Sequence, residues 1–450
     1  MSGSSRFLCV TLLCGSALTL AGCNDGSGDP NAEIGRNPPL PAIQQYLLPP
    51  MHIAKVIGWK QGETPKVPQG LKIEPLATGL QHPRSLYTLP NGDVLVVESK
   101  APKGASIKRP KEIAMNYIES WATSGGKTGA SNRITLLHDS NGDGIPDKQS
   151  VFLDHLNSPF GVVLVGNDLY VANTDAIVKY PYHDGDTKIT AAGETLTPLP
   201  GGPIDHHWTK SLTASPDGKL LYVGVGSNSN ITENGIEAEH NRADILEVDR
   251  ATGRSRIFAS GLRNPNGLTF EPQSHVLWAV VNERDELGPD LVPDYMTSVK
   301  DGAFYGWPYS YYGQNVDPRV KPQRPDLVAK AIPPDYALSS HVAPLGLAFY
   351  TGTNLPEQYR GGAFVGEHGS WNRQILNGYK VVFVPFSNGK PNGKAQDVVT
   401  GFLDSDGRAR GRPVGLAVDK TGGLLIADDV GNTVWHVTSS GTGPSPAARL

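Results

Sequence analysis

The chain has 450 residues, of which 52 are glycine and 37 are proline, about a fifth of the sequence against roughly 12% in average proteins. This excess predicts many turns and therefore many short strands. The formal net charge of −4 gives no cationic footprint for nucleic acid, so that class of partner is excluded from the hypotheses below.

The first 22 residues read as a targeting segment. Arg6 supplies a positive start, and the apolar run Phe7–Leu20 is too short for a membrane-spanning helix. The run ends in Leu20-Ala21-Gly22-Cys23, which resembles the cleavage box of bacterial lipoproteins and predicts Cys23 as the lipid-modified residue. An ordinary signal peptide that is cut nearby is the alternative. The lipoprotein hypothesis predicts export and anchoring to a bacterial membrane, facing the periplasm or the exterior.

Cysteine usage and composition extend this prediction. Two of the three cysteines, Cys9 and Cys14, lie in the segment to be removed, so no internal disulfide is predicted. Residues 23–70 are interpreted as a tether and lead-in, because Asn24 to about Pro50 is rich in Gly, Pro, Asn and Asp. Residues 439–450 are predicted to be a disordered tail.

One β-hairpin pattern organises the rest of the chain. In its clearest copy a strand over Trp208–Ala214 is followed by the turn Ser215–Gly218 and by a returning strand over Lys219–Val225. The pattern occurs six times, over 82–98, 158–173, 208–225, 264–282, 343–366 and 412–428.

The repetition predicts the fold class. Further strand-like runs follow the hairpins, for example Arg133–Leu137 and Asp244–Val248, so each unit is expected to have four antiparallel strands. Radial closure of such units gives an all-β, six-bladed β-propeller, predicted over residues 71–438. A solenoid would need a tighter repeat and lacks this hairpin signature.

Two further segments leave alternatives open. The insertion Lys100–Ser131 is basic and contains a helical pattern over Glu112–Ala122, which is typical of a solvated loop or of a docking surface for an acidic partner. Asp139–Asp147 begins like a calcium-binding loop, but Ser150 stands where the closing Glu is needed. It is either a second calcium site or a polar hairpin tip.

The hairpins predict where a site would form. In a propeller the start of each first strand and the end of each second strand converge at one end, here called the funnel. The residues that enter it are Arg84, Phe160, His206, His207, Arg263, Asn264, His341, Arg410 and Arg412, and the exits include Glu98, Ser227, Glu283–Asp285, Glu367–His368, Arg373 and Asp428–Asp429. Several arginines in one desolvated funnel favour a multiply charged anionic ligand. The alternative is a structural ring in which these arginines pair with the acidic residues.

Five motifs resemble the soluble pyrroloquinoline quinone (PQQ) sugar dehydrogenases, in particular the sorbosone dehydrogenase-like branch. They are His207–Leu212, Gly261–Leu268, Phe304–Pro308, Gly366–Arg373 and Arg410–Gly415, and they occur in order on the six hairpins, over about residues 70–438. The resemblance implies a propeller with PQQ across the funnel and a Ca²⁺ ion held by main-chain carbonyl groups.

By position, the resemblance assigns roles to residues of this chain. His207 matches the general base, and Ca²⁺ is expected near the carbonyl groups of Arg284 and Asp285. The residues expected on the cofactor are Arg84, Arg263, Asn264, Arg373, Arg410 and Arg412.

The chain also departs from the family pattern. The calcium loop is Glu283-Arg284-Asp285 where well-known members have Gly-Pro, and Ser227 stands where a carboxylate orients the histidine. Asp205 or another group must then hold His207, or the base is less strongly oriented.

The resulting hypothesis is a PQQ- and calcium-dependent dehydrogenase. It would oxidise an aldose or a sorbosone-like carbonyl sugar to a lactone or acid, and pass electrons to a quinone or a haem protein. The alternatives are a metal-dependent lactonase, which needs a carboxylate-rich metal centre, and a non-catalytic propeller that binds a glycan or a peptide.

Overall fold

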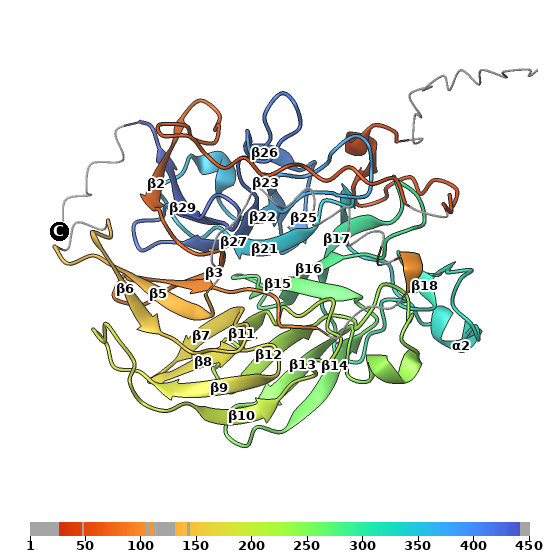
Figure 1. Cartoon of the computed structure of the whole chain (residues 1–450), viewed down its shortest axis with the longest axis horizontal. Coiled ribbons are helices and arrows are strands. Elements are labelled where there is room, and N and C mark those ends of the chain that lie inside the picture. Colours follow the sequence, from red (N-terminus) through yellow and green to blue (C-terminus); the bar gives the residue numbers. More distant parts are fainter. Residues whose placement is uncertain are drawn as a thin grey trace, which may run out of the picture.

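The structure is a computed structural model that describes residues 27–46, 49–104, 109–111, 113, 131–141 and 145–441. Six antiparallel sheets surround a central axis, five with four strands and one with a fifth strand added at its edge, which confirms the predicted six-bladed propeller (Figure 1). Cys23, the pattern 112–122 apart from Ile113, residues 142–144 of the second calcium candidate and residues 442–450 of the tail lie outside the described residues.

The blades follow one another along the chain. The first three contain β3 (Pro83–Thr88), β4 (Val94–Glu98), β5 (Arg133–His138), β6 (Lys148–Leu153); β7 (Gly161–Val165), β8 (Asp168–Ala172), β9 (Ala176–Pro181), β10 (Glu194–Pro198); and β11 (Leu212–Ala214), β12 (Leu220–Val225), β13 (Asp244–Asp249), β14 (Ser255–Ser260). The last three contain β15 (Asn264–Phe270), β16 (Leu277–Asn282), β17 (Pro293–Ser298), β20 (Tyr336–Ser340); β21 (Pro344–Phe349), β22 (Ala363–Glu367), β23 (Lys380–Val384), β26 (Gln396–Val399); and β27 (Pro413–Val418), β28 (Leu424–Asp428), β29 (Thr433–Ser439), β2 (Leu71–Ala77).

In the part of the chain that the structure describes, the elements outside the blades are short. They are η1 (Pro30–Glu33), β1 (Ile34–Gly35), η2 (Ile236–Glu239), β18 (Ser310–Tyr311), β19 (Asn315–Val316), α2 (Pro325–Val328), η3 (Glu357–Tyr359), β24 (Phe386–Ser387) and β25 (Lys390–Pro391). Among the described residues, no helix has the length and apolar character needed to cross a bilayer.

The ring is closed by strands from the two ends of the propeller. The early strand β2 pairs antiparallel with the late strand β29, with Leu71 opposite Ser439 and Ile73 opposite Val437. These two strands join the beginning of the propeller to its last blade, so their hydrogen bonds hold the ring shut.

The core lies between neighbouring blades. The second strand of the first blade, β4, is buried along its whole length, because one of its faces packs on blade two and the other on blade six. Strands covered on both faces read as continuous apolar runs rather than as alternating patterns. This explains the Val-rich and Leu-rich second strands of the hairpins.

Glycines near the start of the first strands let adjacent blades approach closely. A Cβ atom on Gly346 would lie 2.1 Å from the carbonyl oxygen of Val414, and one on Gly415 would lie 2.7 Å from that of Arg84. Glycine at these places removes the clash. The recurrent glycine of the hairpin pattern therefore serves the packing of first strands around the axis.

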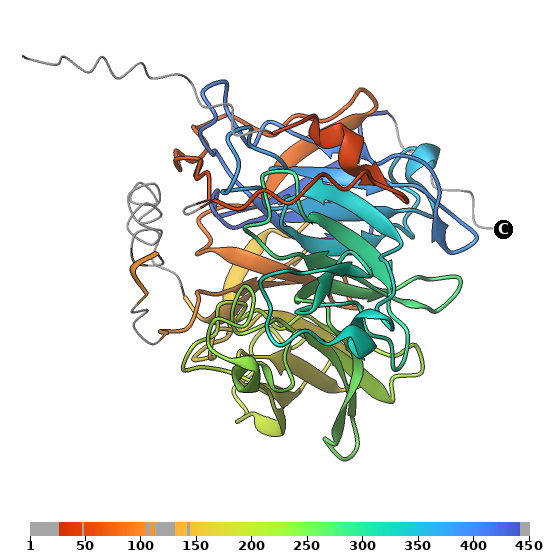
Figure 2. The same ribbon diagram turned by 90° about the vertical axis from the view of Figure 1, so that its right-hand side faces the viewer.

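Residues 27–46 and 49–70, here called the N-terminal strap, differ from the expected flexible tether. β1 adds a fifth strand to blade four by pairing with β20, and backbone bonds join His52 to Trp371 and Ile57 to Ala409. The indole of Trp59 donates to Asp428 over 2.7 Å. The strap (red to orange) runs beside the cyan and blue blades in both views (Figures 1 and 2).

Candidate functional site

The predicted funnel exists, because strand ends of different blades meet there. The guanidinium carbon of Arg84 in blade one lies 5.8 Å and 5.7 Å from the ring centres of Phe160 and Trp208, which precede the first strands of blades two and three. Arg84 also pairs with Asp429, which follows the second strand of blade six. The backbone N–H of Ser227 donates to the carbonyl of Arg263 over 2.7 Å, joining blades three and four.

His207 is held in one tautomer by Ser227. Its Nδ1 lies 2.9 Å from both the carbonyl oxygen and the Oγ of Ser227, and this hydroxyl donates to the carbonyl of Ser229 over 2.6 Å. Both oxygens of Ser227 therefore act as acceptors, which assigns the proton to Nδ1 and leaves Nε2 as the acceptor. Burial and the neighbouring charge of Arg263 hold the pKa of His207 well below its usual value. At neutral pH the imidazole is neutral and can take up a proton.

The segment before β11 sets the position of this histidine. The predicted strand from Trp208 begins only at Leu212, and Thr209 instead donates its hydroxyl to Asn266 over 3.0 Å. A Cβ atom on Gly226 would lie 2.4 Å from Cβ of His207, so only glycine permits this approach. His206 is exposed, whereas His207 is half-buried.

Asp205 does not contact the imidazole of His207, although the sequence suggested that it could orient this ring. It accepts from Arg242 over 2.6 Å and from the hydroxyl of Thr174 over 3.0 Å, and Lys210 lies 3.4 Å away. This buried network anchors the loop before His207. Among the described residues, Ser227 alone makes the orienting contact on the imidazole of His207. The pairing of Arg242 with Asp205 was not predicted, because nothing in the sequence around Arg242 marked it.

Arg263 and Asn264 begin blade four beside His207. The guanidinium of Arg263 donates to the carbonyl of Glu283 over 2.6 Å and to the carboxylate of Asp285 over 2.9 Å. Asn230 also accepts from it through its side-chain oxygen, over 3.0 Å. The side-chain nitrogen of Asn264 donates to Asn282 over 3.2 Å, while its buried Oδ1 has no partner among the described residues.

The predicted calcium loop does not fit a calcium ion. The carbonyl of Asp285 accepts from Nη2 and Nε of Arg284 over 2.7 Å and 3.0 Å, and the carbonyl of Glu283 accepts from Arg263. A dication about 4 Å from one guanidinium would be repelled by about 8 kcal/mol at an effective dielectric constant of about 20. The described residues also contain no cluster of three His, Cys, Asp or Glu side chains suited to a metal.

A second cluster in the funnel surrounds Asp429. Its Oδ2 lies 2.9 Å from Nε2 of His368 and 3.6 Å from Nε2 of His82, and it also accepts from Arg84. Burial opposes ionisation of this carboxylate, but the two histidines and Arg84 outweigh burial and hold its pKa well below the usual range. His82 was not among the predicted funnel residues, although it stands only two positions before Arg84.

The other predicted arginines lie in separate contacts. Arg373 is buried and pairs with Asp290 over 2.8 Å. Arg412 donates to the hydroxyl of Tyr379 over 3.0 Å, with its guanidinium 4.9 Å from the centre of that ring. Arg410 lies 3.5 Å from Glu63 of the strap and is not brought to the funnel cluster by its contacts.

The alternative of a structural ring is therefore realised in part. The arginines with a carboxylate partner are Arg84 with Asp429, Arg263 with Asp285, Arg284 with Asp317, Arg373 with Asp290 and Arg410 with Glu63. Asp429 and Asp285 are among the acidic residues predicted at the strand exits, whereas Glu98, also predicted there, pairs with Arg133. Within the described part of the chain, Arg412 has no ion pair.

Unpaired nitrogen atoms nevertheless remain for an anionic ligand such as PQQ. Buried Nε atoms of Arg84, Arg373 and Arg412, and Nη1 of Arg373, have no hydrogen-bond partner among the described residues. Buried guanidinium N–H groups without an acceptor are costly, and carboxylate oxygens of a ligand would satisfy them. The chemistry of these donors fits an anionic ligand that carries carboxylate groups.

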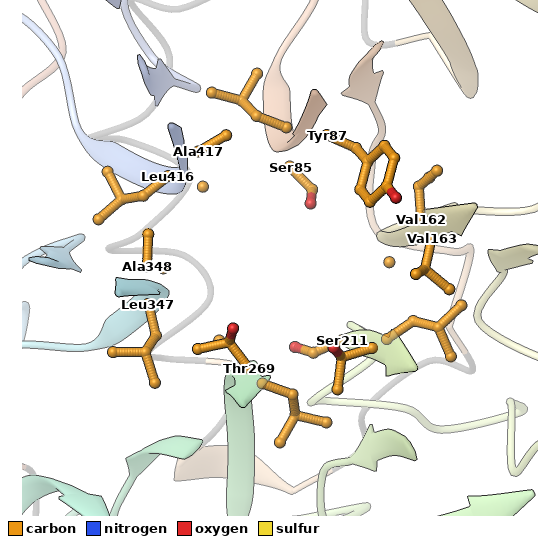
Figure 3. A pocket seen from close by; sticks show the side chains of 18 of the residues that line it. Ser85, Tyr87, Val162, Val163, Ser211, Thr269, Leu347, Ala348, Leu416 and Ala417 are labelled. Carbon is orange, nitrogen blue, oxygen red and sulfur yellow. The ribbon is translucent and has the colours of Figure 1, made fainter. Parts of the chain in front are cut away.

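A cavity of about 330 Å³ follows the propeller axis inside the first strands. Side chains such as Ser85, Tyr87, Ser211, Thr269 and Leu347 surround it (Figure 3). Among the predicted funnel residues that the structure describes, Arg84 and Phe160 line this cavity. The channel therefore begins beneath the funnel, and His207 does not lie in it.

Comparison with known proteins shows which sequences and folds this chain is similar to. An uncharacterised protein of Borreliella burgdorferi is 30% identical over 292 residues, which are 63% of this chain and 76% of that protein. A pyrroloquinoline quinone-dependent pyranose dehydrogenase of Coprinopsis cinerea is 25% identical over 363 residues, covering 71% of this chain but only 44% of the enzyme. The holo form of that enzyme's PQQ domain matches the fold with a TM-score of 0.66 at 21% identity, over 86% of this chain and 100% of the domain.

The chain is thus similar in sequence to soluble PQQ-dependent sugar dehydrogenases, and its fold is similar to theirs, as the motifs implied. The sorbosone dehydrogenase-like branch stays a prediction. A family model described as "Domain of unknown function (DUF7133)" matches residues 66–432, and the chain belongs to this family.

Proposed function

We propose that this protein is a PQQ-dependent dehydrogenase that oxidises a sugar. The observation that carries the proposal is His207, which is neutral, has its proton fixed on Nδ1 and has Nε2 as the acceptor. The similarity to sugar dehydrogenases that use this cofactor supports the same conclusion. The unpartnered donors of Arg84, Arg373 and Arg412 support an anionic cofactor.

The reaction begins with proton transfer to the chain. Nε2 of His207 accepts the proton of the C1 hydroxyl of an aldose, or of the hydrate of a sorbosone-like carbonyl sugar, so that the carbon can release hydride. When bound, PQQ supplies the two-electron acceptor for that hydride. The oxidised sugar leaves as a lactone or an acid.

The cationic residues hold the cofactor and favour the anionic form of the substrate. The Nε atoms of Arg84, Arg373 and Arg412 would donate to oxygen atoms of the cofactor. The unpartnered Oδ1 of Asn264 would accept a hydrogen bond from it. Arg263 lies close enough to His207 to lower its pKa, so its charge also acts on an oxyanion formed there.

The two alternative functions, a lactonase and a non-catalytic binding propeller, can be distinguished from this proposal. A lactonase needs an acidic metal centre, which the described residues do not provide. A binding propeller would show no spectral change with PQQ. Titration of purified protein with PQQ, followed by a screen of aldoses with a dye as electron acceptor, tests the proposal. The expected result is a saturable spectral change and dye reduction by at least one aldose, both absent after heat denaturation.

The physiological partners follow from the same hypothesis. Reoxidation of the cofactor is proposed to pass electrons to a quinone or a haem protein. We also propose that the exported protein is anchored through a lipid on Cys23, as the motif at residues 20–23 indicates. Replacing Cys23 by serine removes the thioether, so a correctly trimmed C23S protein is expected in the soluble fraction. Its retention on membranes would contradict the anchor.

A further inference from the structure

We propose that the loop Asn282–Asp285 serves this site without a divalent metal, because the guanidinium groups of Arg263 and Arg284 supply the positive charge that a calcium ion would bring. The inference rests on the proposed function, since it concerns the loading of PQQ. It departs from the calcium dependence implied by the sequence resemblance.

The first step concerns the carbonyl groups that face Arg263. Its Nη1 lies 2.6 Å from the carbonyl oxygen of Glu283 and 3.3 Å from that of Asn282. Both oxygens would have to turn toward a calcium ion for ligation. With a guanidinium already in place, their lone pairs are directed at a cation that the chain itself provides.

The second step concerns Asp285, whose backbone is held from the other side. Nη2 and Nε of Arg284 donate to its carbonyl oxygen, and the side-chain nitrogen of Asn230 donates to the same oxygen over 3.2 Å. The carboxylate of Asp285 is occupied as well, by Arg263 and by Asn372 over 2.9 Å and 2.8 Å. All three oxygen atoms of this residue therefore already accept hydrogen bonds from the protein.

The third step is that Arg284 cannot easily swing away. Its side chain is 1% exposed and pairs with Asp317, which is also 1% exposed. Asp317 is fixed by the backbone N–H of Arg319, over 2.9 Å, and its carbonyl accepts from Gln323 over 2.7 Å. Moving the guanidinium would leave a buried carboxylate unpaired. The Gly-Pro pair in the corresponding loop of the resembled enzymes carries no such charge.

The experiment measures binding rather than turnover. PQQ is titrated by absorbance into protein treated with a chelator, once with the chelator present and once with millimolar calcium chloride. Calorimetric titration with calcium chloride alone is run on the same protein. The expected result is a PQQ affinity that changes by less than about twofold, and no heat of calcium binding.

The outcomes separate the two ideas. An affinity for PQQ that rises about tenfold or more with calcium overturns the inference, and so does a calorimetric calcium site that Asp139→Asn in the other candidate loop does not remove. Absence of PQQ binding in both solutions overturns the proposed function, while the calcium titration still decides whether the loop is metal-free.

A variant tests whether the guanidinium is the cause. Arg284→Gln combined with Asp317→Asn removes both members of the buried pair, so no lone charge is left behind. Calcium is expected to improve the PQQ affinity of this variant by about threefold or more, because the carbonyl of Asp285 is freed and the repulsion falls. Arg250→Gln, a change in a half-buried arginine that bonds Val165 elsewhere in the propeller, is the matched control. A calcium response that is equal in the double variant and the wild type would refute the role of Arg284.

Discussion

Nδ1 of His207 lies 2.9 Å from each of the two oxygen atoms of Ser227. A serine thus fixes the tautomer without adding a negative charge beside the imidazole. A carboxylate at this place would stabilise the protonated ring and raise its pKa. The base of this chain is oriented by neutral acceptors, and its pKa is set by burial and by Arg263.

Replacement of His207 by alanine removes the proposed base. We expect kcat to fall by roughly 10²–10⁴-fold while PQQ still binds, which is the usual contribution of a positioned base. His206→Ala is the matched control, because His206 is exposed and adjacent, and it should cost far less. Steady-state kinetics of both variants after loading with PQQ make the measurement. Equal losses would show that the base is misassigned.

The pH dependence follows from the lowered pKa of His207. The neutral imidazole is the active form, so activity is present above its pKa and is lost as the pH falls through it. Since burial and Arg263 lower this pKa, kcat/KM should stay level as the pH falls past about 6.5, the usual histidine value, and decline only below it. A decline centred at or above 6.5 would contradict the assignment.

Ser227→Asp should reverse this behaviour. A carboxylate beside Nδ1 favours the charged ring, so the pH at which kcat/KM declines should rise by about one unit or more. Ser227→Ala is the control, because it keeps the carbonyl acceptor and adds no charge, and its decline should stay near that of the wild type. An unchanged profile in Ser227→Asp would show that Ser227 does not face the catalytic base.

The structure separates Arg412 from Arg410, which the sequence had treated alike. Arg412 stacks on Tyr379 and has a buried Nε without a partner among the described residues, whereas Arg410 pairs with Glu63 of the strap. Arg412→Ala should therefore weaken PQQ binding by about tenfold or more, the usual value of a charge-assisted contact. Arg410→Ala should change it by less than about threefold. Titration of both variants with PQQ, followed by absorbance, measures the two affinities. Equal losses of affinity would show that Arg410 also contacts the cofactor in the funnel.

The propeller was predictable because its evidence is local. Each hairpin carries its own turn and its own apolar second strand, and β5, β12 and β13 begin within one residue of the predicted starts. The strand predicted from Trp208 begins later, because the side chain of Thr209 donates to Asn266 and that of Lys210 donates to the backbone carbonyl of Trp208. The strap was missed because a polar, Gly- and Pro-rich composition is shared by flexible tethers and by irregular segments that pack on a surface.

The sequence predicted which residues lie at the funnel, but not which of them contact one another. Pairs such as Arg84 with Asp429, or Arg373 with Asp290, join positions whose proximity depends on how blades are set around the axis. The hairpin pattern placed several arginines at the funnel but could not show which acid each one meets. That pairing also decides which arginine Nε atoms have no partner among the described residues, and which backbone carbonyl groups accept from Arg263 and Arg284.

Asp429 joins blades one, five and six, which makes it a test of the ring itself. Its carboxylate is 1% exposed and contacts Arg84, His82 and His368, so Asp429→Asn leaves a buried guanidinium without its counter-charge. The expected loss is about 3–5 kcal/mol in the free energy of unfolding, measured with urea at neutral pH. Asp406→Asn, at an exposed ion pair with Arg408, is the control and should cost much less.

The same carboxylate predicts how stability changes in acid. Because the pKa of Asp429 is depressed in the folded protein, its contribution is complete above the unfolded value of about 3.9 and is lost as the pH falls below it. The difference in unfolding free energy between wild type and Asp429→Asn should therefore shrink as the pH falls below about 4. If that difference stayed constant with pH, the ionised carboxylate would not be what joins the blades, and packing of the side chain alone would explain the loss.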